Sequence, residues 1–314
     1  MPAVAKKYRN VLVTAKPEAI YGTDAAPEAT TNGVLLRSMT LNPLEQEMES
    51  MDYLRPYFGN GEEISVAESC SAEIEVALAG SGAAGTAPAW GALVRACGIS
   101  ESITPGSKVE YRPITNFMES LTLYAYLDGH VHKIVGSRSD LQLSFTAKKV
   151  PVMKFKLMGL FAPVIDLATP AGAVFTSWKK PVPFSTAFTP DISLFGVSDL
   201  AVESFEFNLG NDLQHRVLVG ADGVEIADRK PSGSSAFRMP PIAAKNWFDV
   251  ARNSDTGAVR IIHGTVPGNI IQFDAPAAQI KNPSYKNSEG DLMLDAKMTF
   301  LPVAGNDEFV ITVK

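Results

Sequence analysis

The chain of 314 residues is poor in cysteine and lacks long apolar stretches. Its two cysteines, Cys70 and Cys97, form no Cys-x-x-Cys pair. We therefore expect two buried thiols made in a reducing compartment, rather than a disulfide or a metal pair. The first residues, MPAVAKKYRN, lack the apolar segment of a signal peptide. Because no apolar run approaches the roughly 18 residues of a membrane span, we expect no membrane partner.

The charge balance argues against tight binding of nucleic acid. Lys and Arg number 28 against 34 Asp and Glu, which gives a formal net charge of -6. No basic run is long enough to neutralise a row of phosphates. The composition is otherwise that of a folded protein, with 46% hydrophobic and 20% charged residues. One large domain or two small ones are expected.

Motifs of catalysis are also missing. The sequence has no Gly-x-Ser-x-Gly, no His-Glu-x-x-His and no P-loop. His130 and His132 would share one face of a strand, but no Cys, Asp or Glu is evidently placed to complete a metal site. His215 and His263 are isolated. We therefore predict a structural protein, with no enzymatic activity, no metal and no cofactor.

One stretch does spell a nucleotide-binding turn. In LAGSGAAGTAPAWGALVRACG, Gly80, Gly82 and Gly85 follow Gly-x-Gly-x-x-Gly ahead of a helix-like segment. A dinucleotide site also needs buried parallel strands and an acidic residue about 20 positions further on. Here the preceding strand is amphipathic, and the nearest acid after the helix, Glu101, comes too early. We interpret the glycines as a flexible turn that feeds a helix.

The sequence is rich in strands of alternating polarity. Apolar and polar residues alternate over 72–79 and again over 152–158. Residues 121–135 hold two such runs joined by Asp128-Gly129, a strong signal for a tight hairpin. Clean alternation leaves one face of a sheet in water, which is typical of antiparallel sheets. We predict a mainly β protein of antiparallel β-sandwich or barrel-like modules.

Two short helices indicate an internal repeat. The segments APAWGALVRACG and PPIAAKNWFDVARNSD share a Trp-x-x-Leu/Val-x-Arg spacing, and each lies between an alternating strand and a hairpin-like pair. The repeated residues are Trp90, Leu93, Arg95, Trp247, Val250 and Arg252. We predict an N-terminal arm (1–32), a first module (33–160), an extended Pro-rich linker (161–190) and a second module (191–314), with one helix flanking each module.

Three segments of the first half resemble the tail tube, or major tail, proteins of long non-contractile-tailed bacteriophages. They are the arm and first strand AIYGTDAAPEATTNGVLLRSMTL, the helix GTAPAWGALVRACG, and the strand and hairpin VEYRPITNFMESLTLYAYLDGHVHKIVGSRSDLQLSF. The resemblance extends over about residues 15–160. It implies a virion protein, made in the host bacterial cytoplasm, whose copies form rings that stack into a hollow tube for DNA ejection.

The resemblance also sets expectations for the partners. If each chain carries two tube modules, three chains would form a pseudo-hexameric ring, and otherwise six chains per ring are the default. The tube would meet tape-measure proteins and tail terminator or tip proteins. Double-stranded DNA would pass through it without specific binding.

Two other classes of protein compete with this interpretation. A β-sandwich binding module for carbohydrate or for adhesion to a host surface would also be strand-rich, but it would need an exposed aromatic platform. Trp90 and Trp247 lie on helices, where core packing is the more common role. A nucleotide-binding oxidoreductase would need the glycine motif to be functional.

Two groups of residues are candidates for tube assembly and DNA passage. Met51–Ser65 is long for a hairpin loop and has the aromatic and Arg residues typical of interfaces. The resemblance implies a loop that projects to the neighbouring ring, and the alternative is a loop folded onto its own subunit. The candidate stacking residues are Tyr53, Leu54, Arg55, Tyr57 and Phe58.

The second group consists of carboxylates on the wet faces of alternating strands. An acidic or neutral lumen would not hold DNA, whereas a basic one would. The alternative is that the wet face points outside the tube. The candidate lumen carboxylates are Glu73, Glu75, Glu203, Glu206 and Asp295.

Overall fold

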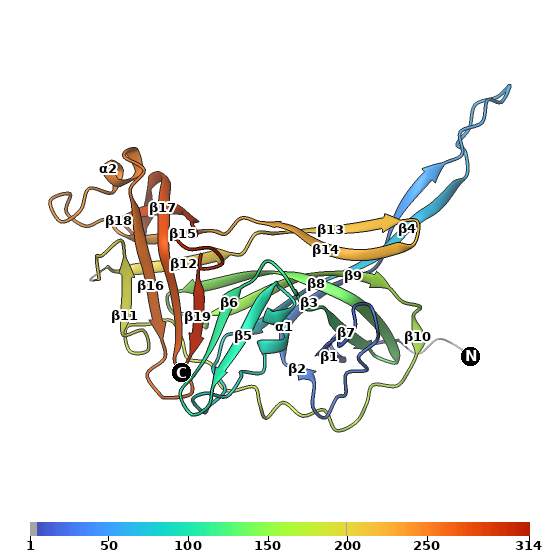
Figure 1. Ribbon diagram of the computed structural model, residues 1–314, viewed down its shortest axis with the longest axis horizontal. Helices are drawn as coiled ribbons and strands as arrows, with labels where there is room; N and C mark the ends of the chain where they lie inside the picture. The colour runs from blue at the N-terminus through green and yellow to red at the C-terminus, as the bar shows by residue number, and fades with distance from the viewer. Residues whose placement is uncertain (1–4, 199) are drawn as a thin grey trace.

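The computed structural model describes residues 5–198 and 200–314, so residues 1–4 of the predicted arm lie outside the described residues. The predicted fold class is confirmed: 53% of the structure is strand and 4% helix, in a large antiparallel sheet with two short helices (Figure 1). The strands of the first half are β1 (Val11–Pro17), β2 (Gly33–Val34), β3 (Leu36–Ser50), β4 (Glu63–Ala77), β5 (Ile99–Thr104), β6 (Lys108–Pro113), β7 (Leu121–Leu127), β8 (His130–Thr146) and β9 (Val152–Phe161). Those that follow are β10 (Ile165–Asp166), β11 (Asp191–Leu194), β12 (Val202–Asn208), β13 (Asn211–Leu218), β14 (Ala221–Arg229), β15 (Ser232–Arg238), β16 (Thr256–His263), β17 (Ile271–Ser288), β18 (Asp291–Phe300) and β19 (Val310–Val313).

The alternating patterns form strands with one buried face, as predicted. In β4, Ile74 and Val76 are fully buried, while Glu73 and Glu75, which alternate with them, are half-buried. The Asp-Gly hairpin joins β7 to β8, with a φ of 43° at Asp128 and 96° at Gly129. Both positions need positive φ in a tight primed turn, which is why this pair of residues was diagnostic.

Two series of strands have the same order in the sheet. In the first half the order is β3-β4-β9-β8-β7, and in the second half it is β12-β15-β18-β17-β16. The two series are joined where the end of β8 pairs with β12, from Gln142↔Asn208 to Thr146↔Ser204. Eight strands therefore form one continuous run, β3-β4-β9-β8-β12-β15-β18-β17 (Figure 1).

The long strands β8 and β17 each belong to two parts of the structure. Their last residues lie in the eight-strand run, while their first residues pair with other strands. The start of β8 pairs with β7 and β10, and β7 continues to β1 and β2. The start of β17 pairs with β16 and β19, β16 continues to β11, and β19 continues to β6 and β5. One large apolar core fills both halves.

The helices α1 (Gly91–Arg95) and α2 (Trp247–Arg252) each bring a tryptophan into this core. The Trp90 ring lies 5.0 Å from that of Tyr111, and its indole N–H donates to the carbonyl of Ala79 over 2.7 Å. The Trp247 ring lies 4.9 Å from that of Phe237. Both tryptophans are fully buried, so the predicted core packing is confirmed and neither can serve as an exposed carbohydrate platform.

The remaining repeat residues divide into buried and exposed positions. Leu93 and Val250 are buried in the core beside the two tryptophans. Arg95 lies near the carboxylates of Glu101 and Glu119, at 3.7 and 3.3 Å. Arg252, by contrast, is exposed, and among the described residues it pairs only with Asp249 of its own helix. The apolar part of the repeat is therefore structural, and the two arginines have different surroundings.

The glycine turn does lead into α1, but flexibility is not what requires its glycines. A side chain at Gly80 would come within 2.2 Å of the carbonyl oxygen of Gly268, and one at Gly85 within 2.3 Å of the amide nitrogen of Gly106. The N–H of Gly82 donates to the Gly268 carbonyl over 2.9 Å. The cluster is thus a close-packed junction between loops, because only glycine lets backbones approach this closely.

The two cysteines are free and buried, as expected. Burial raises the pKa of Cys70 to about 12 and also raises that of Cys97. Both thiols are therefore protonated and unreactive at neutral pH.

Candidate assembly surfaces

One face of the eight-strand run is polar across every strand. Cross-strand partners place the following residues in one row: Ser38, Glu75, Lys154, Gln142, Asn208, Ser232, Thr299 and Gln279. The neighbouring row on the same face contains Ser144, Glu206, Ser234, Lys297 and Lys281. The row between these two points the other way and is apolar, with Met153, Leu143 and Phe207 all buried. This sheet therefore has one core face and one wet face along its whole width.

The wet face is hollowed and its charges balance. A groove of about 640 Å³ lies on it, lined by residues that include Glu75, Lys154, Glu206, Lys281 and Lys297. The accessible carboxylates on this face are Glu73, Glu75, Glu206 and Asp295, and the accessible amines are Lys154, Lys156, Lys281 and Lys297. The guanidinium of Arg37 also reaches Glu75, so charges of both signs are interspersed on this face and it neither attracts nor repels DNA strongly.

Four of the five predicted lumen carboxylates share this face. Glu73 pairs with Lys154, and Glu75 lies 3.4 Å from Arg37. Glu203 lies apart from these rows, in a bulge of β12 between Val202 and Ser204. There its carboxylate accepts hydrogen bonds from Ser288 and Lys286, which lower its pKa.

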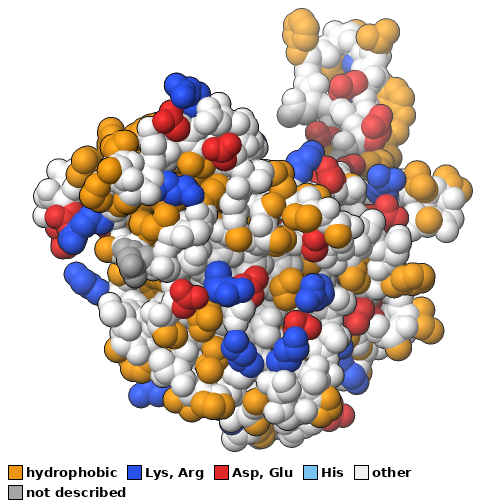
Figure 2. Space-filling model, turned by 60° about the vertical axis from the view of Figure 1, so that its left-hand side comes forward, with side chains coloured by type: hydrophobic (Ala, Val, Ile, Leu, Met, Phe, Trp, Pro, Cys, Tyr) orange, Lys and Arg blue, Asp and Glu red, His pale blue; other side chains and the backbone are white. Residues whose placement is uncertain are grey.

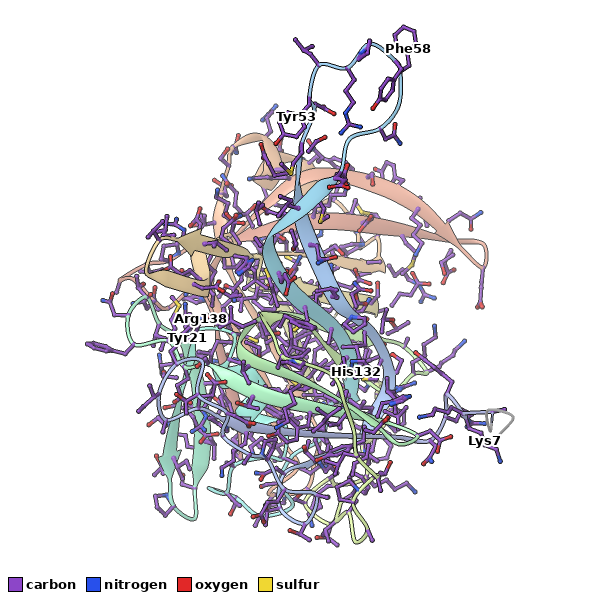
Figure 3. The ribbon with its side chains drawn as sticks, turned by 90° about the vertical axis from the view of Figure 1, so that its right-hand side faces the viewer. Lys7, Tyr21, Tyr53, Phe58, His132 and Arg138 are labelled. Atoms are coloured by element: carbon purple, nitrogen blue, oxygen red, sulfur yellow. The ribbon has the colours of Figure 1, made fainter. Side chains whose placement is uncertain are left out.

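The predicted stacking residues lie at the end of a long projecting hairpin. Strands β3 and β4 pair from Leu36↔Val76 out to Ser50↔Glu63, so the loop is 51–62 and the last predicted loop residues belong to β4. Figure 3 shows Tyr53 and Phe58 at the end of this extension, away from the rest of the molecule. Leu54 and Phe58 are as exposed as in an extended peptide, at 105% and 107%. The loop is therefore not folded onto its own subunit.

A second hairpin, β13–β14, was missed by sequence reasoning. It interrupts the connection from β12 to β15, and its strands pair from Asn211↔Arg229 to Leu218↔Ala221. The available signal was the alternation on both sides of Gly220, which resembles the other hairpins. Its tip carries the exposed apolar residues Val217, Leu218 and Val219.

The middle of β13–β14 is fastened by the N-terminal arm and by β8. The hydroxyl of Tyr21 accepts the N–H of Val224 over 2.6 Å, and Arg138 donates to the carbonyl of Val224 over 2.9 Å. The guanidinium of Arg138 also lies 5.2 Å from the centre of the Tyr21 ring (Figure 3). Burial raises the pKa of Tyr21. These contacts fix the direction of the hairpin.

Tyr21→Phe should therefore loosen the hairpin without unfolding the protein. The change removes the acceptor of the Val224 N–H, a loss of about 1 kcal/mol, so the Val224 amide should exchange its hydrogen roughly five- to tenfold faster. Hydrogen exchange resolved by NMR or mass spectrometry measures this. Tyr285→Phe is the matched control, because Tyr285 is an exposed tyrosine on β17 whose hydroxyl is not among the hydrogen-bond partners of Val224 in the described residues. Unchanged exchange at Val224 would contradict the assigned contact.

The eight-strand run ends in two unpaired strand edges. Among the described residues β3 pairs only with β4, and the end of β17, Ile280–Ser288, pairs only with β18. The carbonyl of Met39 accepts the hydroxyl of Tyr8 over 2.9 Å, so it points away from β4. The N–H of Met39 points the same way, because both groups of a strand residue lie on one side. Open edges of this kind accept a further strand.

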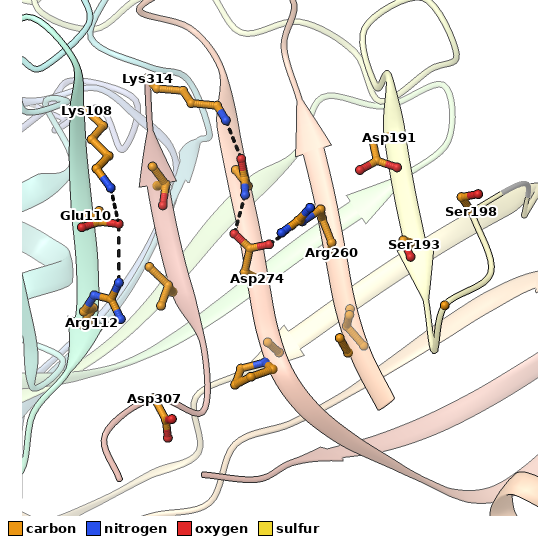
Figure 4. Close-up of a pocket in the computed structure, with 18 residues that line it drawn as sticks. Lys108, Glu110, Arg112, Asp191, Ser193, Ser198, Arg260, Asp274, Asp307 and Lys314 are labelled. Carbon is orange, nitrogen blue, oxygen red and sulfur yellow. Dashed lines mark hydrogen bonds and ion pairs between the residues drawn. The ribbon is translucent and has the colours of Figure 1, made fainter. Parts of the chain in front are cut away.

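A cleft of about 840 Å³ lies on the strands β6, β19, β17, β16 and β11 and is lined by charges of both signs (Figure 4). Glu110 lies between Lys108 and Arg112, at 2.9 and 3.5 Å. Asp274 accepts hydrogen bonds from Arg260 and Gln272, and Gln272 in turn accepts one from Lys314. Figure 2 shows the basic and acidic side chains intermixed on this side of the molecule. The charges neutralise one another, so the cleft has no excess charge with which to recruit phosphate.

The histidines make local contacts. His130 lies between Asp166 and Lys6, each 2.6 Å away. Burial, with a smaller effect of His130, lowers the pKa of His132. Within residues 5–198 and 200–314, no three His, Cys, Asp or Glu side chains are grouped as a metal site would require. No helix in this part of the chain is both long and apolar enough to span a membrane.

Comparison with protein families identifies the family of this chain. The family model described as "Phage tail tube protein" matches residues 9–297, which is nearly the whole chain. No curated protein matches.

Proposed function

This chain belongs to the phage tail tube protein family and is a non-enzymatic structural component of the virion tail, and from that premise we propose how it builds the tube. The observation that carries the proposal is the continuous eight-strand run with its polar, hollowed face. We also propose that the tail is of the long non-contractile type, because about residues 15–160 resemble the tail tube proteins of bacteriophages with such tails.

The two halves of the chain act as two copies of one tube module. The support is their strand order, β3-β4-β9-β8-β7 and β12-β15-β18-β17-β16, and the place of each helix after the second strand of its series. Each helix also contributes a buried tryptophan, Trp90 or Trp247. With two modules in this chain, each subunit supplies two of the six modules of a pseudo-sixfold ring.

The joint between the halves serves as the template for the joint between chains. Within the chain, the end of β8 pairs with β12. The strands in the same positions of the two series are β17, whose end is unpaired, and β3, whose outer edge is open. Pairing β17 of one copy with β3 of the next repeats the internal joint and makes a head-to-tail interface.

Three chains close such a ring at a suitable size. Three runs of eight strands make a barrel of about 24 strands, which is wider than the roughly 16 to 18 at which a barrel leaves an aqueous channel. Six chains would double that number. The wet, hollowed face of the run then lines the channel, and its balanced charges let DNA pass without being held. Tape-measure and terminator or tip proteins meet this tube inside and at its ends.

Electron microscopy of the purified protein tests the proposal. We expect hollow tubes of uniform width, and reconstruction or mass measurement should count three chains per ring. Six chains per ring, or subunits joined through surfaces other than β3 and β17, would overturn the ring as proposed. A tail with a contractile sheath on the virion would overturn the assigned tail type.

Glu206→Lys should slow DNA passage while leaving the tube intact. Glu206 is exposed, and no ion pair of its side chain is found in the described part of the chain. The change places a third amine in the row that holds Lys297 and Lys281. Each ring gains positive charge towards the phosphates, so ejection should slow and become more salt-dependent. Ejection kinetics of assembled virions measure this.

Glu206→Gln is the matched control, because it removes one charge without adding another and should slow ejection less. Normal ejection rates for Glu206→Lys at low salt would mean that this face does not line the channel.

A further inference from the structure

The β13–β14 hairpin has an apolar tip that its own subunit does not cover, and we propose that this tip is a second docking element for another copy of the chain in the adjacent ring. The inference rests on the proposed function. It adds a contact beyond the β3–β4 extension and names Leu218 and Val219 as its anchors.

The composition of the tip is unusual for a turn in water. Positions in tight hairpin turns favour Asn, Asp and Gly, which tolerate positive φ and are well hydrated. Here Gly220, with a φ of 94°, satisfies the backbone, but Val219 beside it is 110% exposed. Leu218 is 67% exposed. Full burial of each of these two apolar side chains would contribute about 1.5–3 kcal/mol of stabilising free energy, which is lost while they lie in water.

Below the tip, the exposed side chains of the hairpin are mostly polar, and its apolar Val224 is buried. His215 lies 2.8 Å from Asp222, and Arg216 lies 3.4 Å from Glu225 across the two strands. In the middle of the hairpin, Tyr21 and Arg138 bind the backbone of Val224. The exposed apolar residues are therefore concentrated at the tip of a hairpin whose strands are charged and held in place. Apolar anchors that enter a partner at an interface are arranged in this way.

The position of the tip indicates which partner it meets. His215 and Leu218 line a hollow of about 330 Å³ together with Glu47 and Ala67 of β3 and β4. The tip thus lies beside the shaft of the hairpin that carries Tyr57 and Phe58. The two hairpins also connect the equivalent strands, β3 with β4 and β12 with β15. If the β3–β4 hairpin docks on the adjacent ring, the β13–β14 tip can reach the same ring. The partner of the tip is therefore a second copy of this chain.

Thiol labelling of Val219→Cys tests the contact directly. The native thiols of Cys70 and Cys97 are buried, so the introduced thiol should account for most of the labelling by a maleimide. We expect fast labelling of free subunits and labelling at least about tenfold slower in tubes, because a covered thiol is shielded from the reagent. Val303→Cys is the matched control: Val303 is 69% exposed in a loop that Asp307 closes by accepting backbone N–H groups.

The outcomes separate this inference from the proposed function. Protection in tubes at position 219, with continued labelling at 303, supports the docking role. Equal labelling of free and assembled Val219→Cys overturns it while leaving the tube itself in place. Failure of the wild-type protein to form any tube overturns the proposed function and this inference together.

A second variant removes the apolar tip. Leu218→Ser with Val219→Asn should leave folded subunits and rings but raise the protein concentration needed for tubes by roughly tenfold, the equivalent of about 1.4 kcal/mol per contact. Tube formation at the wild-type concentration would overturn the role of the tip.

Discussion

Met39→Pro should give a folded protein that forms neither rings nor tubes. The N–H and carbonyl of Met39 point to the open edge of β3, where the proposed partner is β17 of the next chain. Proline removes that N–H and places its ring in the path of the incoming strand, yet it costs no hydrogen bond to β4. The loss recurs at every joint of a ring, so we expect the largest effect of any single substitution considered. Sedimentation and negative-stain microscopy measure it.

The size of the effect follows from what the internal joint provides. Where β8 meets β12, the apolar faces bury Leu143, Phe145, Phe205 and Phe207. Each such side chain contributes about 1.5–3 kcal/mol when fully buried. The open edges hold the partly buried Met39 and Leu41 on one side and the exposed Tyr285 on the other. If strand pairing at the β3 edge is blocked, these groups stay exposed. The protein concentration needed for assembly should then rise by at least about 100-fold, the equivalent of about 2.8 kcal/mol.

Met39→Leu is the matched control, because it keeps the N–H and an apolar side chain, and it should assemble normally. Circular dichroism should show the same strand content and melting for Met39→Pro as for the wild type. Rings formed by Met39→Pro would rule out β3 as the joining edge.

Tyr57→Ser with Phe58→Ser should stop stacking while preserving the subunit. Both side chains lie on the β3–β4 extension, at 65% and 107% exposure, and touch no part of their own core. Their removal therefore costs the monomer little. In the tube they would be anchors at an interface, where losing an aromatic residue typically costs about 2 kcal/mol or more. Electron microscopy should show single rings or short stacks in place of long tubes.

Ile103→Ser is a control for the loss of an exposed apolar side chain elsewhere, since Ile103 is 48% exposed at the end of β5. Its tubes should have normal length. Long tubes from the Tyr57 and Phe58 double variant would show that the extension does not join rings.

Local sequence patterns determined the strands, the hairpin at Asp128-Gly129 and the burial of Trp90 and Trp247. These features depend on interactions between residues that are close in the chain. Alternation fixes which face of a strand is buried, and a turn with two positive φ values requires residues such as Asp and Gly. The exposed loop before β4 was predictable for the same reason, because its aromatic and Arg residues stand outside any alternating pattern.

Only the tertiary structure decided how the strands are ordered and which edges remain open. The pairing of β8 with β12 joins residues about 60 positions apart, and periodicity contains no information about such a partner. The same is true of Gly80, whose need for glycine comes from the distant backbone of Gly268. The β13–β14 hairpin was missed although the alternation around Gly220 is a local signal for it, and its direction depends on Tyr21 and Arg138, which are distant in the chain. Strand character is local, whereas the surfaces that would join one copy to the next arise from long-range packing.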